Sequence, residues 1–444
     1  MKVQPLKGFR DYGPEEMLVR EQMIDRVRGV FESFGYAPIH TPALEYSDVL
    51  LGKYGDEGEK LLYRFDDNGG RDVALRYDLT VPLARFVASN PNLRFPFRRY
   101  HIAPVWRAER PQKGRFREFY QCDVDLLGVD TAAADAECIL IDFMVMNALG
   151  LDGFRIEVNH RGFLDGLLEH FGVPKTGQIG VMRALDKVDK VSREELVKLV
   201  AAEGVSEETA DSLVSVGDVV GSNQERLDAC RRLVEGNAKA EEALDRLEYV
   251  FAAVFEAEES APVFFTPAIA RGLDYYTGVV YETFLPKSYG VGSVMSGGRY
   301  DGLIGMFANA QVSAVGISLG IDRLLSALEA HGEKQEIRLS RVMVCAMPEL
   351  EAACFGIAQL VRKFVGGRGR GVELYPKAVR LKKQLDYANK KGIEVLVIPG
   401  PDELAQGMVM VKNMATGAQE TVPVMHLPEV VQRMLSGVAT EESR

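Results

Sequence analysis

The sequence lacks the patterns that mark membrane, secreted and disulfide-bonded proteins. It contains no apolar stretch of about eighteen residues, the length that spans a bilayer, and its first residues form no hydrophobic signal core. The five cysteines form no CxxC pair and their number is odd, so a disulfide framework or a cysteine-rich zinc site is not expected. These absences predict a cytoplasmic protein with reduced thiols and no membrane partner.

Common phosphate-binding motifs are absent as well. The sequence has no GxxxxGK[ST] loop and no HExxH pair. The string GGRGRG at residues 366–371 differs from the GxGxxG fingerprint and is interpreted as a basic loop. If the protein handles phosphates, it must hold them with arginine side chains rather than with a P-loop or a Rossmann turn.

Charge is distributed unevenly along the chain, whose formal net charge is −11. Residues 192–260 contain seventeen Asp and Glu against seven Lys and Arg, a balance of −10. Residues 98–117 contain seven Lys and Arg with one acid, and residues 362–391 contain ten with two acids. Each cationic run taken alone is equally consistent with a solvated surface, but a local positive patch is what attracts phosphates.

A chain of 444 residues has room for two or three domains. A helix is expected to begin at Pro14, and short runs at 36–41, 61–65 and 72–76 predict an antiparallel sheet. The expected organisation is an α+β domain built on an antiparallel sheet flanked by helices (1–330), a helical acidic insertion within it (172–262), a linker (331–340) and a C-terminal α/β domain (341–444).

Residues 105–128 carry the first group of candidate site residues. Strand alternation places Phe119, Gln121, Asp123 and Asp125 on one face, which would suit a ligand with a flat ring and an amine. The preceding strand and the loop add Arg107, Glu109, Arg110, Lys113, Arg115 and Arg117. A polar strand face can also simply meet water, but the density of arginine beside acids favours a ligand site.

Two further strings carry candidate site residues. RGLDYYTGVVYE (271–282) combines a guanidinium with tyrosines, and SGGRYDGL (296–303) has paired glycines that permit close backbone approach. The glycines are also consistent with a hairpin turn, and the tyrosines with core packing. In VGISLGIDRLL (315–325), Arg323 falls in the first turn of an expected helix, where the helix dipole favours phosphates.

The ordered motifs resemble histidyl-tRNA synthetase, a class II aminoacyl-tRNA synthetase, from residue 7 to about residue 417. They are KGFRDYGPEE (7–16), LRYDLTVP (75–82), RAERPQKGRFREFYQCDVD (107–125), RGLDYY (271–276) and GISLGIDR (316–323). The resemblance implies a class II catalytic domain, a C-terminal anticodon-binding domain and a homodimer that pairs around residues 36–47. It also implies a reaction in which histidine and ATP, with Mg²⁺, form an adenylate and pyrophosphate before histidine moves to its tRNA.

The resemblance implies a role for each matching residue. For histidine binding these are Asp78, Leu79, Thr80, Arg107, Gln121, Asp125, Arg271, Tyr275 and Tyr276. For ATP they are Arg107, Glu109, Arg115, Phe119 and Arg323, with Arg107 and Arg271 catalytic. For tRNA they are Gln112, Lys382 and Lys383. The chain has LRYDLT where other members have an LRPEGT-like string, so Asp78 replaces a longer glutamate.

Two other functions remain open from the sequence. The first is a synthetase-like regulatory subunit of histidine biosynthesis that binds histidine without charging tRNA; such paralogues usually lack the anticodon domain. The second is RNA binding alone. The retained arginines at 107, 271 and 323 favour the ligase, because joining a carboxylate to a phosphate brings two anions together and requires cationic groups.

Overall fold

The computed structural model describes residues 3–51, 61–110, 114–188, 191–270, 276–307, 311–332, 340–365 and 371–436. Contacts between residues divide the chain into two compact units: Met1–Asp11 with Arg20–Lys334, and Tyr12–Val19 with Gln335–Arg444. The predicted linker falls largely outside the described residues, since helix α12 ends at His331 and strand β12 begins at Ser340.

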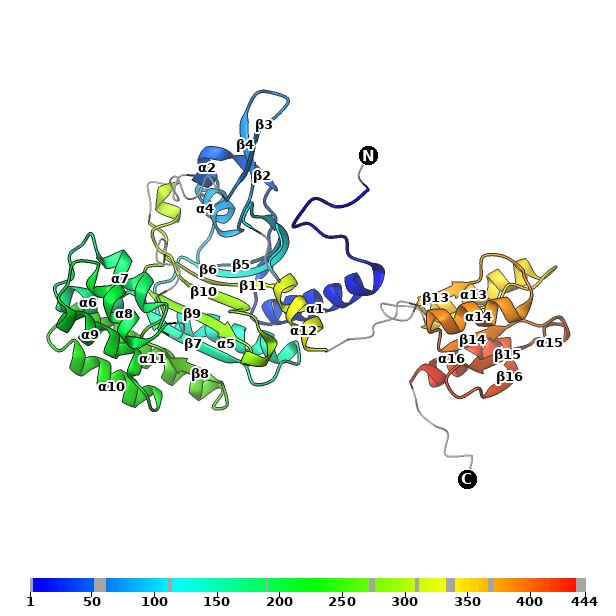
Figure 1. Ribbon diagram of the computed structural model, residues 1–444. Coiled ribbons are helices and arrows are strands. Elements are labelled where there is room, and N and C mark those ends of the chain that lie inside the picture. Colours follow the sequence, from blue (N-terminus) through cyan, green and yellow to red (C-terminus); the bar gives the residue numbers. More distant parts are fainter. Residues whose placement is uncertain are drawn as a thin grey trace. The chain divides into compact units, whose positions relative to one another are not determined.

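An eight-stranded sheet forms the centre of the first unit, in the order β1-β5-β6-β11-β10-β9-β7-β8 (Figure 1). Its strands are β1 (Ala37–Pro38), β5 (Phe97–Trp106), β6 (Glu118–Leu127), β7 (Arg155–His160), β8 (Val263–Phe265), β9 (Val279–Phe284), β10 (Met295–Arg299) and β11 (Ala314–Gly320). The strands from β5 to β7 pair antiparallel, whereas the edge strands β1 and β8 pair parallel to their neighbours. The predicted antiparallel sheet is therefore confirmed for the six central strands.

A separate three-stranded sheet has the order β2-β4-β3. It consists of β2 (Leu44–Tyr46), β3 (Tyr63–Asp66) and β4 (Asp72–Leu75), accompanied by helices α2 (Ser47–Leu51) and α4 (Thr80–Ala88). The prediction that the runs at 36–41, 61–65 and 72–76 share one sheet is wrong. The tight turn at 67–70 joins only β3 to β4, and β1 pairs instead with β5 of the large sheet.

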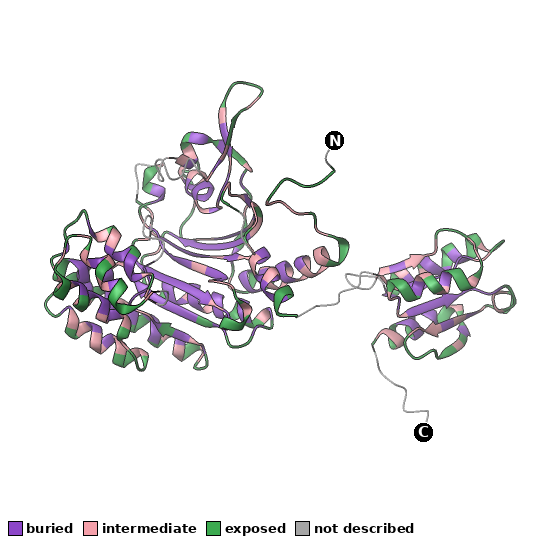
Figure 2. Ribbon diagram, in the orientation of Figure 1, coloured by how far each residue is buried: buried purple, intermediate pink, exposed green. Residues whose placement is uncertain are grey.

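Helices close one face of the large sheet. They are α1 (Pro14–Ser33), α5 (Ala132–Ala148) and α12 (Ile321–His331). The Arg20 guanidinium lies 4.1 Å from the centre of the Tyr120 ring, and Arg20 Nη2 donates to Asp322 Oδ2 at 3.0 Å. The small sheet and α4 lie toward the opposite face (Figure 1), where Leu79 packs with Phe119. The burial colours of Figure 2 show the strands of the large sheet buried between these layers.

The acidic segment folds as helices, as the sequence predicts. Helix α6 (Arg161–His170) precedes it, and the segment contributes α7 (Gln178–Leu185), α8 (Arg193–Ala201), α9 (Glu207–Val214), α10 (Asn223–Leu233) and α11 (Ala238–Ala257). Short 3-10 helices span Ser215–Asp218, Lys287–Tyr289, Ile304–Met306 and Val424–His426. The side chains of Ser192, Ser206 and Ser222 accept backbone N–H groups at the starts of α8, α9 and α10, which explains where these helices begin.

The second unit contains a five-stranded sheet in the order β13-β12-β14-β15-β16. Its strands are β12 (Ser340–Val344), β13 (Gly371–Leu374), β14 (Val395–Ile398), β15 (Met408–Asn413) and β16 (Gln419–Pro423), and its helices are α13 (Glu351–Val365), α14 (Leu381–Lys391), α15 (Pro401–Ala405) and α16 (Leu427–Leu435). The first three strands pair parallel and the last two antiparallel. This confirms the predicted α/β fold with a partly parallel sheet.

Candidate active site

A cavity of about 210 Å³ opens on the face of the large sheet that α1 and α12 leave uncovered. It is lined by Arg107, Glu109, Arg110, Gly114, Arg115, Phe116, Phe119, Gln121, Ser293, Val294, Ser296, Ser318, Gly320 and Arg323. All five residues predicted to bind ATP are among them, together with Gln121. The structure thus brings together side chains from β6, from the loop before it and from the first turn of α12.

Arg107 and Phe119 contact each other in this cavity. The Arg107 guanidinium lies 5.0 Å from the centre of the Phe119 ring, and Arg107 Nε donates to the Tyr77 carbonyl at 3.1 Å. The ring packs on a buried apolar cluster that contains Leu79 and Val105. A flat apolar surface beside a fixed cation suits a ligand that carries an aromatic base and a phosphate.

The N-terminal segment braces the loop that lines the cavity. The backbone N–H of Arg117 donates to the Gly8 carbonyl at 2.8 Å, and its guanidinium donates to the carbonyls of Lys7 and Glu109, both at 3.1 Å. Gly8 has φ +88°, and a Cβ there would lie 2.8 Å from Arg117 Cδ. Only glycine fits this close approach. The sequence analysis did not predict this contact, since no local pattern links residues 110 positions apart.

Two polar side chains at the floor of the cavity, Gln121 and Ser318, lie next to a third, Asp123, that is buried behind them. Gln121 Nε2 donates to Ser318 Oγ at 2.8 Å, and Ser318 lies directly across from Asp123 in the β6–β11 ladder. Burial raises the pKa of Asp123 to about 7, while the charge of Arg99 and a hydrogen bond from Ser318 act to lower it. The floor therefore combines an amide and a hydroxyl, with a titratable carboxyl buried behind them.

Asp125 lies deeper than the cavity lining. It is 3% exposed, Arg99 Nη2 lies 2.5 Å from its Oδ2, and Tyr300 donates its hydroxyl to Oδ1. Burial raises the pKa of Asp125 and the Arg99 charge lowers it. A Cβ at Gly316 would collide with this carboxylate, at 2.0 Å from Oδ1, so glycine makes room for it.

Tyr276 precedes β9, and its ring lies over Gly298 of β10. A Cβ on Gly298 would lie 2.9 Å from the Tyr276 ring, and Gly298 pairs with Gly316, the glycine beside Asp125. The two predicted imidazole contacts therefore stand over adjacent positions of β10 and β11. The alternative that Gly297 and Gly298 form a hairpin turn is wrong, because both lie within β10 and their missing side chains make room for neighbouring strands and for Tyr276.

Asp78, Leu79 and Thr80 lie at the start of α4. Asp78 Oδ1 accepts the Val81 N–H at 3.0 Å, and burial raises the pKa of this carboxyl while the Val81 N–H and the Arg107 charge lower it. Leu79 is fully buried beneath Phe119. None of the three is among the described residues that line the cavity.

The remaining predicted residues fall into two groups. Arg271, Tyr275 and Gln112 lie outside the described residues. Lys382 and Lys383 are exposed on α14 in the second unit.

The sequence analysis missed the serines of the cavity, namely Ser293, Ser296 and Ser318. It interpreted residues 315–320 as the approach to a helix, whereas they form most of β11. Alternation along that strand would have placed Ser318 on the same face as Gly316 and Gly320. Residues 316–320 also spell GxSxG, but Ser318 lies within an antiparallel ladder rather than on a strand-to-helix turn, so the string is no hydrolase elbow here.

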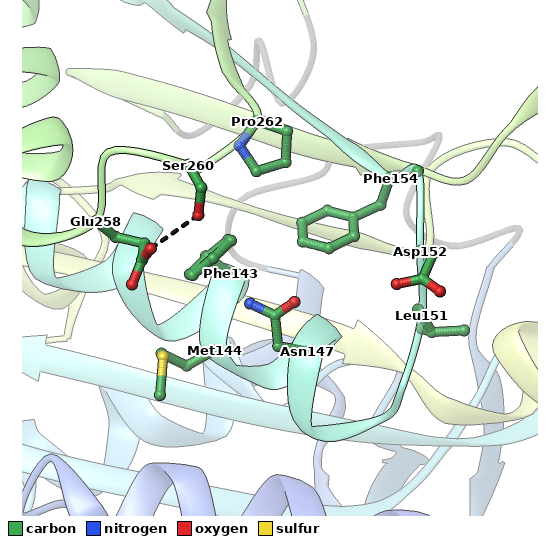
Figure 3. A pocket seen from close by; sticks show the side chains of 10 residues that line it. Phe143, Met144, Asn147, Leu151, Asp152, Phe154, Glu258, Ser260 and Pro262 are labelled. Atoms are coloured by element: carbon green, nitrogen blue, oxygen red, sulfur yellow. Dashed lines mark hydrogen bonds between the residues drawn. The ribbon is translucent and has the colours of Figure 1, made fainter.

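A second, larger hollow of about 610 Å³ lies beside the C-terminal end of α5 (Figure 3). It is lined by Phe143, Met144, Asn147, Leu151, Asp152, Gly153, Phe154, Glu258, Ser260 and Pro262. These described residues include two acids and no base, so this hollow does not suit a phosphate. The smaller cavity, with its four arginines, is the candidate active site.

The part of the chain that the structure describes shows neither a metal cluster nor a membrane-spanning helix. Within the described ranges, no group of three or more His, Cys, Asp or Glu side chains converges as a metal site. Of the helices that the structure describes, none is both long and apolar enough to cross a bilayer.

Comparison with known proteins agrees with this geometry. Residues 8–324 match the histidyl-tRNA synthetase family, and residues 341–434 match an anticodon binding domain. The chain is 42% identical to a histidine–tRNA ligase of Rhodopirellula baltica over 96% of both proteins, and 40% identical to that of Aeropyrum pernix over 97% of this chain and 98% of the relative. The crystal structure of histidyl-tRNA synthetase from Nostoc sp. PCC 7120 superposes with a TM-score of 0.88 at 30% identity, covering 98% of this chain and 99% of the other. The chain belongs to the histidyl-tRNA synthetase family.

Proposed function

We propose that the protein is a histidine–tRNA ligase, which joins histidine to ATP, releases pyrophosphate and transfers the histidyl group to the 3′ end of its tRNA. The observation that carries the proposal is the cavity in which Arg107, Arg115 and Arg323, contributed by separate parts of the chain, converge beside Phe119 and Gln121. No observation favours the regulatory-subunit alternative.

Nucleotide binding follows from the chemistry of the lining residues. Phe119 would stack on adenine, and Arg107, held beside it at 5.0 Å, would contact the α-phosphate. Arg323 in the first turn of α12 would contact the γ-phosphate, where the helix dipole also favours an anion. Glu109 would lie near the base, and Arg115 would cover the phosphates. Cations fixed around the phosphate lower the barrier for attack by a carboxylate, since two anions must meet.

Histidine would lie along β6, with its amine near Gln121 and its ring toward Asp125. Asp78, Leu79 and Thr80 would complete the amine end, while Arg271, Tyr275 and Tyr276 would enclose the carboxylate and the ring. Asp125 already forms an ion pair with Arg99 and accepts the Tyr300 hydroxyl, but a carboxylate has about four lone-pair positions and can accept an imidazole N–H as well. A ligand without that donor would forgo a buried hydrogen bond, which costs on the order of 1–3 kcal/mol.

Magnesium would enter with ATP rather than bind a protein cage. Among the described residues that line the cavity, Glu109 is the one carboxylate, and it could bind a water of the ion. When bound, the ion would neutralise phosphate charge in the same way as the arginines.

The domain boundaries and tRNA contacts are also part of the proposal. A catalytic domain would span residues 1–330 with the insertion at 172–262, followed by a linker at 331–340 and the anticodon-binding domain at 341–444. Lys382 and Lys383 are exposed on one helix and could contact phosphates of the anticodon arm. Gln112 would meet the acceptor end.

A homodimer and a cytoplasmic location complete the proposal. Leu44, Tyr46 and Phe65 are 45%, 58% and 46% exposed in the small sheet, and the last two both pair with Val73. Such an apolar patch on adjoining strands, with Leu44 and Tyr46 inside the segment predicted to pair, supports a protein interface there. Five unpaired buried cysteines support a reducing compartment.

The decisive experiment is ATP–pyrophosphate exchange measured with each of the twenty amino acids. We expect exchange to be stimulated by histidine alone, followed by histidylation of bacterial or archaeal tRNA. Folded protein that shows no histidine-dependent exchange would contradict the proposal, and exchange without tRNA charging would favour a partial, regulatory activity.

Sedimentation analysis of the wild type and of Tyr46→Lys tests the dimer, because a charge on the apolar patch should yield monomers.

A further inference from the structure

A buried hydrogen-bond chain below the candidate histidine site ends in an acceptor without a donor. Gln121 is 8% exposed, and its Nε2 donates to Ser318 Oγ at 2.8 Å. Its other amide atom, Oε1, is buried and has no hydrogen-bond partner among the described residues. A buried acceptor without a donor costs about 1–3 kcal/mol, so this oxygen points to a ligand that donates.

Asp123 decides which way the Gln121 amide is turned in this series of hydrogen bonds. The oxygen and nitrogen of an amide can be told apart only by the groups around them. Ser318 lies opposite Asp123 in the β6–β11 ladder and its hydroxyl makes a hydrogen bond to that carboxylate. Above about pH 7 the Asp123 carboxylate is ionised and only accepts, so the hydroxyl proton of Ser318 must point toward Asp123. Ser318 Oγ then accepts a hydrogen bond from Gln121, so the NH₂ group of Gln121 must be the donor.

The neighbouring strand supplies a charge that favours the ionised form of Asp123 against the effect of burial. Arg99 on β5 is fully buried, and its charge is the strongest influence favouring the ionised form of Asp123. Asp123 itself is 2% exposed and does not line the cavity, so it acts on a ligand only through Ser318 and Gln121.

We propose that Asp123 and Ser318 are positioning residues that orient the Gln121 amide with its oxygen toward the cavity, so that the site accepts a primary ammonium group. The inference rests on the proposed function, in which the ligand amine is the α-ammonium of histidine. It adds a reason why the amine of the ligand is bound by a hydrogen-bond acceptor. Gln121 donates to Ser318 and Ser318 donates to Asp123, which leaves Gln121 Oε1 free to accept from the ligand.

The isosteric change Asp123→Asn reverses the relay. The Arg99 charge favours the amide oxygen of the new side chain on its own side, so the NH₂ group faces Ser318 and donates to it. The Ser318 hydroxyl then donates to Gln121 Oε1, and the Gln121 N–H turns toward the ligand. An N–H group and an ammonium group are both donors and cannot form a hydrogen bond with each other. Ligands that carry an amine should therefore lose affinity, while ligands without an amine should not.

The test compares two ligands by calorimetry on the full-length protein at about pH 8, where Asp123 is ionised: histidine, and 3-(imidazol-4-yl)propionate, which lacks only the amine. For Asp123→Asn we expect a loss of histidine affinity of about 10–100-fold and a change of less than about twofold for the deaminated ligand. Ser318→Ala, which removes the middle of the relay without reversing it, should give a smaller loss with the same ligand dependence. Asp152→Asn, a carboxylate of the second hollow, is the control and should alter neither affinity.

The outcomes separate the relay from the proposed function. Equal losses for both ligands in the two variants, or no loss for either, would overturn the relay while leaving histidine binding intact. If the wild type binds neither ligand and shows no histidine-dependent exchange, both proposals fall. Should Asp123→Asn fail to fold, Ser318→Ala still decides, because a loss confined to histidine supports the relay and a loss shared by both ligands contradicts it.

Discussion

Asp322 on one face of the large sheet, and Gln121 and Asp123 on the other, differ in whether their buried oxygens have hydrogen-bond donors. On the face covered by α1 and α12, Asp322 Oδ2 receives Arg20 at 3.0 Å and the backbone N–H of Tyr120 at 2.6 Å. On the face toward the cavity, Gln121 and Asp123 each keep a buried oxygen for which the described residues supply no donor. The first arrangement stabilises the fold, whereas the second leaves a desolvation cost that a ligand or water must offset.

The largest expected effect comes from breaking the closed face. Asp322→Ala leaves the Arg20 charge and the Tyr120 N–H buried without this carboxylate, and we expect the first unit to lose about 3–5 kcal/mol of unfolding free energy. Urea denaturation measures it. Asp25→Ala is the matched control, since the Arg28–Asp25 pair on the same helix α1 is partly exposed and should contribute less than about 1 kcal/mol. Equal losses in the two variants would refute the contrast between buried and exposed pairs.

The next effect comes from the open face and should leave stability alone. Arg107→Ala removes the cation held beside Phe119, and we expect kcat for ATP–pyrophosphate exchange to fall about 100–1000-fold with an unchanged urea midpoint. Arg71→Ala, an exposed arginine paired with Asp67 in the β3–β4 turn, should retain normal exchange. A large loss of stability in Arg107→Ala would show instead that Arg107 stabilises the fold, as Arg20 does.

Sequence reasoning worked best where a pattern is local. Strand alternation placed Phe119 and Gln121 on one face, and the apolar spacing of α12 put Arg323 in its first turn; all three residues line the cavity. It also failed locally where a strand carried an unfamiliar composition. The glycines of β10 and β11 resembled turns and a helix approach, although they lie inside strands and make room for Tyr276 and Asp125.

Contacts between distant segments could not be predicted from the sequence. The donation from Arg117 to the Lys7 carbonyl joins residues 110 positions apart, and the Gln121–Ser318 bond joins residues 197 apart. No periodicity fixes such pairs, because they depend on how complete elements pack. The relay from Gln121 through Ser318 to Asp123 depends on the register of β6 against β11, which pairs Ser318 with Asp123.

A smaller, more selective effect is expected where the N-terminal segment braces the cavity loop. Arg117→Ala removes the bonds to the Lys7 and Glu109 carbonyls and loosens the loop that bears Phe116, over which Arg10 lies at 5.1 Å. We expect KM for ATP in the exchange reaction to rise about 10–30-fold, while histidine affinity measured without ATP stays constant. Arg117→Lys should not restore the KM, because one ammonium lacks the planar fork that reaches both carbonyls. A parallel loss of histidine affinity would show a general disruption instead.

The smallest effect concerns Asp142 of α5, which is buried on the closed face and accepts the Thr283 hydroxyl. Burial raises the pKa of this carboxyl from 3.8 to about 7. The folded state therefore binds the proton more tightly than the unfolded state, so its contribution to stability is complete below about pH 4 and is lost as pH rises through about 7. Asp142→Asn removes the charge but not the shape, and should raise the unfolding free energy relative to wild type by about 1–2 kcal/mol at pH 8 and not at pH 4. Urea titrations of both proteins at the two pH values measure the difference. A gain that is equal at both would mean that packing rather than ionisation sets it, and the closed face would then hold no buried titrating acid at this position.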